Sequence, residues 1–324
     1  MKYGLTLAAG IAAFGAQADP LTIYAPDYFA SEWGPGPSIK AAFEESCDCE
    51  IEYVTGDVLP RLLLEGERTR ADVVIGLASD VTKKARETGL FAPHGQDSSL
   101  LTLPVEWTDD TFLPFNWSYT AFIYDNTKIT NPPTSFEELV NSDEDWTIAI
   151  QDPRTSVSGL AMVLWGHEVF GEGAQEAWAK LAPKVSVVTQ GWSEAYGLFA
   201  DGEVDMVLSY TTSPAYHIIA EEDDTKSAAI FDEGHYMLVE LAAKVADTDQ
   251  PELADAFMAF ILDERFQSLI PTANWSYPSA LPESEWPAAF SELNYPSKAL
   301  YLQEADAAAL RDQAIAEWRA AFSQ

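Results

Sequence analysis

One stretch of the sequence reads Val204-Asp205-Met206-Val207-Leu208-Ser209-Tyr210-Thr211-Thr212-Ser213-Pro214-Ala215-Tyr216-His217. Its first half, residues 204–210, has the short apolar character of a buried strand. In its second half a proline stands where the first turn of a helix tolerates one, and the hydroxyls before it suit a helix cap. The stretch predicts a strand that leads through a hydroxyl-rich turn into a helix.

Two earlier segments repeat this order of strand, turn and helix. The strand expected at 146–150 leads into Gln151-Asp152-Pro153-Arg154-Thr155-Ser156-Val157-Ser158-Gly159 and a helix over 159–170. The strand expected at 185–189 leads into Gln190-Gly191-Trp192-Ser193-Glu194-Ala195-Tyr196, where we expect Ser193 to cap a helix that ends at Ala200.

These three turns predict a binding site. In an open α/β sheet, ligands bind beyond the carboxyl ends of the strands, so three helix N-termini would meet at one cleft beside Trp192, Tyr210 and Tyr216. The helix amides favour an anion such as phosphate, and the rings offer π faces to a cation. The pattern suits a ligand with an aromatic ring, a cationic ring and an optional phosphate tail. The alternative is that the rings only pack in the core and that Ser156 only caps its helix.

The rest of the chain fits an α/β fold with a largely parallel sheet. Further strands are expected at 21–24, 51–54 and 71–77, with a helix at 37–46 between the first two. The aromatic run 115–124 is extended and suits a connection between lobes. Ser135 and Glu138 have the spacing of a capping box.

Residues 1–18 are typical of a cleavable signal peptide. Lys2 precedes an apolar run over 5–14, and the small-residue triplet Ala16-Gln17-Ala18 follows. We expect cleavage after Ala18 and a mature protein that is soluble outside the cytoplasm, since the run is too short to span a membrane. The remaining 306 residues suit two lobes, which we place at 19–118 with 228–324 and at 119–227, with C-terminal helices free to cross back.

The charge balance excludes one class of partner. Without Lys2 the chain has 17 basic and 52 acidic residues, a net charge of −35. Such a field repels nucleic acid and anionic membrane surfaces and attracts small cations. The alternative, which we favour over steering of a substrate, is a strongly hydrated surface suited to a saline habitat.

The two cysteines, Cys47 and Cys49, are separated by one residue. In an oxidising compartment they can form a small disulfide, whereas two thiols without a neighbouring ligand make a poor zinc site. We expect a structural role and no metal.

The sequence carries no motif of an enzyme. Gly191-Trp192-Ser193-Glu194-Ala195 lacks the final glycine of a nucleophile elbow, and the four histidines, at 94, 167, 217 and 235, stand in no triad-like context. It contains no His-Glu-x-x-His, no Gly-x-x-x-x-Gly-Lys and no Gly-x-Gly-x-x-Gly. We therefore expect no catalytic residues.

The chain resembles the periplasmic thiamine-binding proteins of bacterial importers over nearly its whole length after residue 18. The resemblance rests on the segments 31–37 (SEWGPGP), 71–77 (ADVVIGL), 152–156 (DPRTS), 191–199 (GWSEAYGLF), 208–217 (LSYTTSPAYH) and 270–275 (IPTANW). It implies a type II periplasmic-binding-protein fold, with a ligand cleft between two lobes joined by crossing hinge segments. It also implies a monomer that delivers thiamine, thiamine monophosphate or thiamine diphosphate to an ABC permease with its ATPase, without a cofactor.

The resemblance also implies the ligand contacts. Position by position they are Trp33, Ser156, Trp192, Tyr210, Tyr216 and Trp275. Further candidates are Asp27, Gly56 and Asp57, where the chain departs from its relatives: Pro26 replaces an aromatic residue, with Tyr28 nearby, and the loop at 55–57 is shorter.

The same architecture also carries other cargo. Polyamines suit acidic residues and aromatic walls, but the positive ends of three helices disfavour a ligand that is cationic throughout. Ferric ion favours clustered tyrosinates, whereas Tyr210 and Tyr216 are separated by a helix start.

Overall fold

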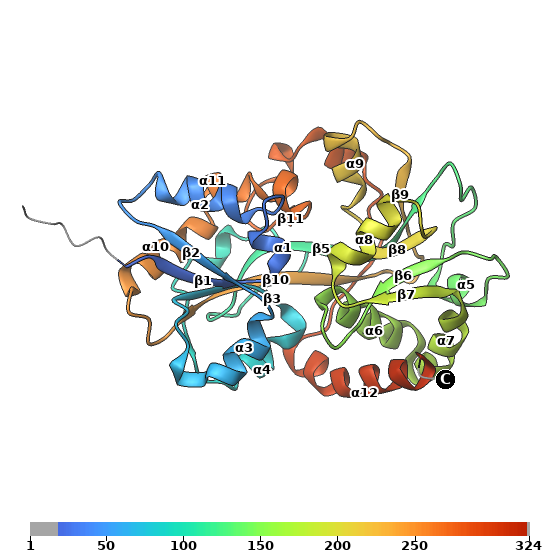
Figure 1. Cartoon of the computed structure of the whole chain (residues 1–324), viewed down its shortest axis with the longest axis horizontal. Helices are drawn as coiled ribbons and strands as arrows, with labels where there is room; N and C mark the ends of the chain where they lie inside the picture. The colour runs from blue at the N-terminus through green and yellow to red at the C-terminus, as the bar shows by residue number, and fades with distance from the viewer. Residues whose placement is uncertain (1–18, 323–324) are drawn as a thin grey trace, which may run out of the picture.

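The computed structural model describes residues 19–322, and this range forms two α/β halves joined by two long strands (Figure 1). The signal peptide expected at 1–18 lies outside the described residues. The strands are β1 (Leu21–Ala25), β2 (Ile51–Thr55), β3 (Val73–Ala78), β4 (Phe91–Ala92), β5 (Leu113–Asp125), β6 (Ile148–Gln151), β7 (Val185–Thr189), β8 (Met206–Tyr210), β9 (Lys226–Ala229), β10 (His235–Val245), β11 (Tyr277–Pro278) and β12 (Ala299–Leu300). The helices are α1 (Asp27–Ala30), α2 (Gly36–Glu44), α3 (Val58–Glu65), α4 (Thr82–Arg86), α5 (Phe136–Asn141), α6 (Val157–Phe170), α7 (Ala174–Leu181), α8 (Trp192–Ala200), α9 (Pro214–Ala220), α10 (Pro251–Ile261), α11 (Glu264–Gln267) and α12 (Glu304–Phe322). Short helical turns are η1 (Gly66–Arg68), η2 (Ser79–Val81), η3 (Ser98–Leu100), η4 (Gly171–Gly173), η5 (Ala182–Lys184), η6 (Ile270–Asn274), η7 (Glu283–Glu285) and η8 (Ala288–Glu292).

The sheet has the order β2-β1-β3-β10-β5-β8-β6-β7. Strands β2, β1 and β3 are parallel, and so are β8, β6 and β7. Between these groups, β10 and β5 are antiparallel to each other and to their outer neighbours. The expectation of a largely parallel sheet therefore holds for the outer groups and is wrong at the centre. The reason is that β5 and β10, with 13 and 11 residues, are long enough to pair in both halves and carry the chain across.

Each half has its own apolar core. In the first half, Ile23 of β1, Phe43 of α2 and Phe257 of α10 pack together. In the second half, Trp165 of α6 and Trp178 of α7 belong to a cluster that also holds residues 318 and 321 of α12.

The C-terminal helix α12 packs against α6 and α7 and lies below them in Figure 1. The last helix therefore returns to the second half after the chain has passed through the first. The lobe boundaries at 118/119 and 227/228 stay a prediction.

Two of the expected helix caps are wrong. Helix α8 begins at Trp192 after Gly191, without a side-chain cap, so Ser193 lies inside the helix. Ser213 precedes α9, but its hydroxyl accepts a hydrogen bond from the Tyr210 amide instead of capping the helix. At α9 the Tyr210 amide in the turn competes with the helix for the Ser213 hydroxyl, and at α8 Gly191 occupies the cap position.

The expected capping box at α5 is half formed. The hydroxyl of Ser135 accepts from the Glu138 amide at 2.9 Å. The Glu138 carboxylate reaches one residue further back, to the Thr134 amide and hydroxyl, instead of the Ser135 amide.

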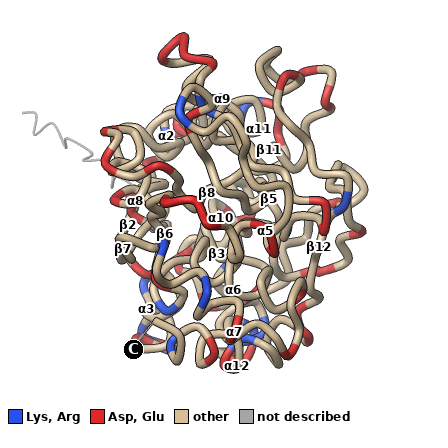
Figure 2. The backbone as a smooth tube through the Cα atoms, turned by 90° about the vertical axis from the view of Figure 1, so that its right-hand side faces the viewer, with Lys and Arg blue, Asp and Glu red and all other residues tan. Residues whose placement is uncertain are grey.

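In the backbone trace of Figure 2, red segments of Asp and Glu are more widespread than blue segments of Lys and Arg and lie in loops and helices of both halves. Over residues 19–322, no helix combines the length and apolar character needed to cross a membrane.

Candidate functional site

The start of α6 is fixed by a chain of hydrogen bonds. The Ser156 hydroxyl caps the helix, 3.5 Å from the Gly159 amide, and lies 2.9 Å from the Ser158 hydroxyl. Ser158 donates to the Gln151 side chain at 2.8 Å, and Gln151 donates to the Leu208 carbonyl at 3.0 Å. A Cβ atom at Gly159 would approach the Gln151 carbonyl oxygen to 2.5 Å, so glycine lets the helix sit close to the strand end. The N-terminus of α6 is thereby held at the carboxyl ends of β6 and β8.

Trp192, at the start of α8, is tied to the next strand. Its indole NH donates to the Ser209 hydroxyl at 2.8 Å, and Ser209 lies 2.7 Å from the Ser213 hydroxyl. One face stacks on Tyr196, with ring centroids 4.7 Å apart and planes 23° apart. Trp192 remains partly exposed, so the structure holds its ring in place without burying it.

Tyr210 lies at the carboxyl end of β8 and is half-buried. Burial raises the pKa of its phenol, the nearby Ser158 hydroxyl opposes the shift, and the charge of Asp80 adds to it. The phenol is therefore neutral at physiological pH and available as a hydrogen-bond donor.

Tyr216 and Trp275 are brought together from distant parts of the sequence. Their ring centroids are 5.2 Å apart at an interplanar angle of 77°, an edge-to-face arrangement. Trp275 has φ 52° and ψ 39°, in the left-handed region that a bulky side chain rarely adopts. Such a conformation costs about 1–3 kcal/mol and persists where surrounding structure imposes it, often at functional sites. The pKa of Tyr216 is raised by its hydrogen bond with the Glu221 carboxylate.

The remaining candidates lie in the first half. Trp33 is 56% exposed in the turn between α1 and α2. Asp27 is exposed in the first turn of α1, and Asp57 is the residue before α3. The Gly56 amide donates to the Ala25 carbonyl at 3.1 Å, at the carboxyl ends of β2 and β1. Within residues 19–322, none of these four makes a ring contact or hydrogen bond with Trp192, Tyr216 or Trp275.

Glu240 is a polar residue of the site region that the strand pattern did not single out. It lies in β10, 8% exposed, and its carboxylate accepts hydrogen bonds from the Tyr28 hydroxyl and the side-chain amides of Asn116 and Asn274. Burial raises its pKa to about 7, and the bond from Asn274 opposes the shift. A sequence signal existed, because Glu240 is the one acidic residue in the apolar run 236–243.

One group of side chains has the composition of a metal site. The ligand atoms of His217, Glu221 and Asp223 lie within 4.8 Å of one another. His217 is already bonded to Glu221 at 2.6 Å and to the Tyr196 hydroxyl at 3.0 Å, and Asp223 forms an ion pair with Lys226 at 3.0 Å. These ligand atoms are thus engaged within the protein.

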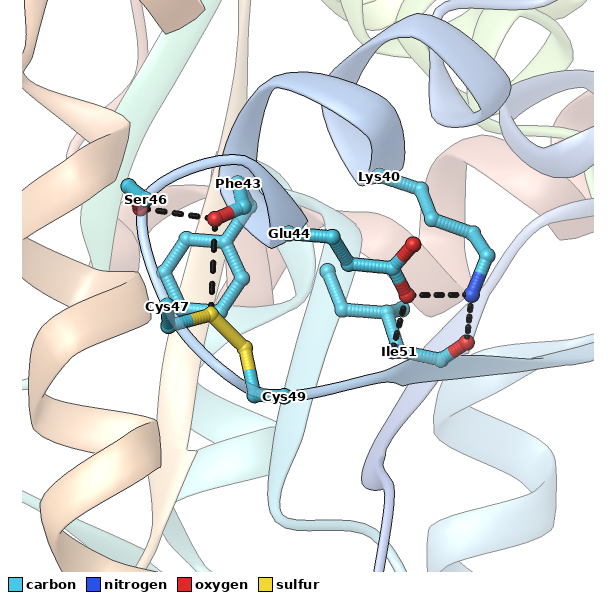
Figure 3. The surroundings of a disulfide bond; sticks show 7 residues. All are labelled: Lys40, Phe43, Glu44, Ser46, Cys47, Cys49 and Ile51. Atoms are coloured by element: carbon cyan, nitrogen blue, oxygen red, sulfur yellow. Dashed lines mark hydrogen bonds and ion pairs between the residues drawn. A yellow bond between two sulfur atoms is a disulfide. The ribbon is translucent and has the colours of Figure 1, made fainter.

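A disulfide joins Cys47 and Cys49 in the loop between α2 and β2 (Figure 3). Next to it, Glu44 accepts hydrogen bonds from Lys40 and from the Ile51 amide, so the helix end is tied to the strand start. The bond lies in the first half and contacts none of the candidate ligand residues, which is compatible with a structural role.

Two hollows lie elsewhere on the described part of the chain. One, of about 470 Å³, is lined by the loop 98–107, and the other, of about 330 Å³, lies beside residues 132–134 and 294–295. None of the candidate ligand residues lines either of them.

The architecture, two α/β halves joined by long crossing strands, is that of a solute-binding protein. The family model of bacterial extracellular solute-binding proteins matches residues 25–268, and the chain belongs to this family. The expected type II periplasmic-binding-protein fold and the transport role without enzymatic activity are thereby confirmed.

Within this family the chain is similar to thiamine-binding proteins. It is 49% identical over 308 residues to the thiamine-binding periplasmic protein of Escherichia coli, covering 94% of each chain. It matches a solved structure titled periplasmic thiamin binding protein with a TM-score of 0.92 and 48% identity, covering 97% of this chain and 100% of that one. Iron-bound HitA from Pseudomonas aeruginosa is 21% identical with a TM-score of 0.75, over 93% of this chain and 99% of that one, which reflects the fold alone.

Proposed function

We propose that this protein binds thiamine in the periplasm and delivers it to an ABC permease for import. The observation that supports this most is the near-complete match, in sequence and in fold, to thiamine-binding relatives. The geometry agrees with such a ligand, since Tyr216 and Trp275 meet edge to face and Trp192 is held partly exposed by Ser209.

The phosphorylated forms are also proposed as ligands. The N-terminus of α6, with Ser156 as its cap, offers amides and hydroxyls without a net charge, which suits a phosphate tail. Arg154 adds no net charge there, because it forms an ion pair with Asp152. We therefore assign the phosphate to Ser156 and the rings to Trp192, Tyr210, Tyr216 and Trp275, with Trp33, Asp27, Gly56 and Asp57 contributing from the first half.

Binding would close the two lobes about β5 and β10, and only the closed form would dock productively on the permease with its ATPase. We assign residues 19–118 and 240–303 to one lobe and 119–227 to the other. Residues 228–239 and α12 are added to the second lobe, because residues between 229 and 238 belong to its core and α12 packs on α6 and α7. The mature protein would begin at Asp19, after removal of residues 1–18, and act as a monomer.

Isothermal titration calorimetry of the chain starting at Asp19 tests this function. Thiamine, thiamine monophosphate, thiamine diphosphate, spermidine and ferric citrate are titrated in parallel. Saturable heat with the thiamine forms and none with spermidine or ferric citrate is expected. Binding of spermidine without binding of any thiamine form would replace thiamine by a polyamine as the cargo.

A further inference from the structure

Glu240 is a buried carboxylate without a cationic partner in the described part of the chain, residues 19–322. Its oxygens accept from Tyr28, Asn116 and Asn274, and all three donors are neutral. Among residues 19–322, no Lys, Arg or His forms an ion pair with it. A buried carboxylate is costly to keep ionised without a cation, and burial accordingly raises its pKa to about 7.

Glu240 lies where the cores of the two halves meet. On β10, Tyr236 and Leu238 belong to the core of the second half, and Ala242 belongs to that of the first. The ladders of β10 are irregular at this point, with register shifts at 240/241 against β5 and at 241/242 against β3. A carboxylate at the junction of two apolar cores adds no apolar packing to either core. This favours a role in ligand binding over a role in stability.

On the neighbouring strand β5, a row of buried polar side chains, here called the polar seam, extends from Glu240. Asn116 pairs with Glu240, and Ser118 and Thr120 follow at alternate positions of β5, on the same face. All three are buried, and Ser118 lies 3.3 Å from the hydroxyl of Thr212, in the turn between β8 and α9. The seam thus runs from Glu240 to the turn that precedes Tyr216.

Glu240 is also connected to the rings. Asn274, one of its donors, directly precedes Trp275, whose ring meets Tyr216. Tyr28, another donor, directly follows Asp27 in α1. The carboxylate is therefore hydrogen-bonded to the residue that directly precedes one member of the aromatic pair assigned to the ligand rings.

We propose that Glu240 is the counter-charge for the cationic ring of the ligand and sets the preference for that ring over a neutral ring of the same shape. This inference rests on the proposed function, because it takes thiamine as the ligand. In a poorly solvated setting a single carboxylate acts over several ångströms, and its attraction for a cation stabilises its own ionised form.

The test compares thiamine with an isostere in which carbon replaces the positively charged ring nitrogen. Dissociation constants are measured for the wild type, Glu240→Gln and the control Glu252→Gln, which removes an exposed charge in the first turn of α10. The wild type should bind thiamine about tenfold or more tightly than the isostere. Glu240→Gln should raise the dissociation constant of thiamine by about tenfold and that of the isostere by less than threefold. Glu252→Gln should change neither dissociation constant.

Equal weakening of both ligands in Glu240→Gln would reduce Glu240 to a structural role and overturn the inference, as would an unchanged preference. If the wild type binds neither ligand, the proposed function itself fails.

If Glu240→Gln does not fold, a pH series on the wild-type protein tests the inference by itself. Its preference for thiamine over the isostere should increase from pH 5.5 to pH 8.5 as the carboxyl ionises, and a constant preference would refute the role. Among the described residues, Tyr28 of α1, Asn116 of β5, Asn274 of η6 and Ala78 of β3 face Glu240, and of these Tyr28 is titratable.

Discussion

Replacement of Ser156 by alanine separates a ligand contact from a helix cap. The Ser156 hydroxyl lies 3.5 Å from the Gly159 amide, a long capping bond, so its loss should cost stability near the lower end of the usual 0.5–2 kcal/mol. A hydrogen bond from this hydroxyl to a phosphate oxygen would be worth about 1.5–3 kcal/mol. Thiamine monophosphate should therefore bind roughly 10- to 150-fold more weakly to Ser156→Ala, whereas free thiamine should bind almost unchanged.

Trp192→Ala should have the opposite signature. Its ring is held by Ser209 at 2.8 Å and by Tyr196, and it would stack on a ring that both ligands share. The loss of about 1–3 kcal/mol of stacking should weaken thiamine and thiamine monophosphate by the same factor, roughly 5- to 150-fold.

Calorimetry gives both affinities, and urea unfolding gives the stability of each variant. Ser135→Ala is the matched control, because Ser135 caps α5 with a bond of 2.9 Å and is not among the ligand candidates. It should lose stability without losing affinity. Equal losses for both ligands in Ser156→Ala would place the phosphate elsewhere, with Gly56 and Asp57 the next positions to test. Lost stability with unchanged affinity would reduce Ser156 to a cap.

Three further predictions concern stability. Burial lowers the pKa of His235 to about 4, below the usual 6.5, so on acidification the unfolded chain binds a proton before the folded protein does. The free energy of unfolding should therefore fall by roughly 3 kcal/mol from pH 6.5 to pH 4, and urea titrations should show a smaller fall in His235→Gln. Gly166→Ala should destabilise by about 1–3 kcal/mol, since a Cβ atom there would lie 2.2 Å from the Trp178 ring, and a melting temperature equal to the wild type would contradict this packing. Replacement of Cys47 and Cys49 by serine should cost less than about 3 kcal/mol, because the loop that they close is very short, and should leave thiamine affinity unchanged in the same calorimetric assay.

The segments around the site could be predicted because their signals are local. Strand β7 has the expected bounds, and β6 and β8 begin two residues later than expected, since short apolar runs ended by polar turns define a strand well. The start of α6 was found within two residues because a serine and a proline stand near it. The sequence favours Ser193 as the helix cap because serine is a common cap residue. It does not show that the helix begins one residue earlier, at Trp192, with Gly191 at the cap position.

The centre of the molecule could not be predicted in the same way. The periodicity of an apolar run does not encode the direction of its neighbour, so the antiparallel pairing of β5 with β10 was missed. The contact between Tyr28 and Glu240 spans 212 positions, and that between Tyr216 and Trp275 spans 59, so each depends on the completed fold. The resemblance to a family named Trp275 as a candidate, but nothing local to it indicated that Tyr216 would be its partner.

The acidity of the chain leads to a prediction that separates long-range charge from local contacts. The net charge of −35 on the chain that starts at Asp19 attracts free thiamine, a cation, and repels the anionic tail of thiamine monophosphate. Because Arg154 is paired with Asp152, the hydroxyls and amides at α6 must hold the phosphate against this field. Salt screens the field over about 10 Å at 0.1 M and about 3 Å at 1 M, but affects close hydrogen bonds much less. Raising sodium chloride from 0.02 M to 0.5 M should therefore weaken the binding of thiamine. The affinity for thiamine monophosphate relative to that for thiamine should rise by about twofold or more. Parallel weakening of both ligands would show that the surface charge does not reach the site, and a shift towards thiamine would indicate that a net positive charge holds the phosphate.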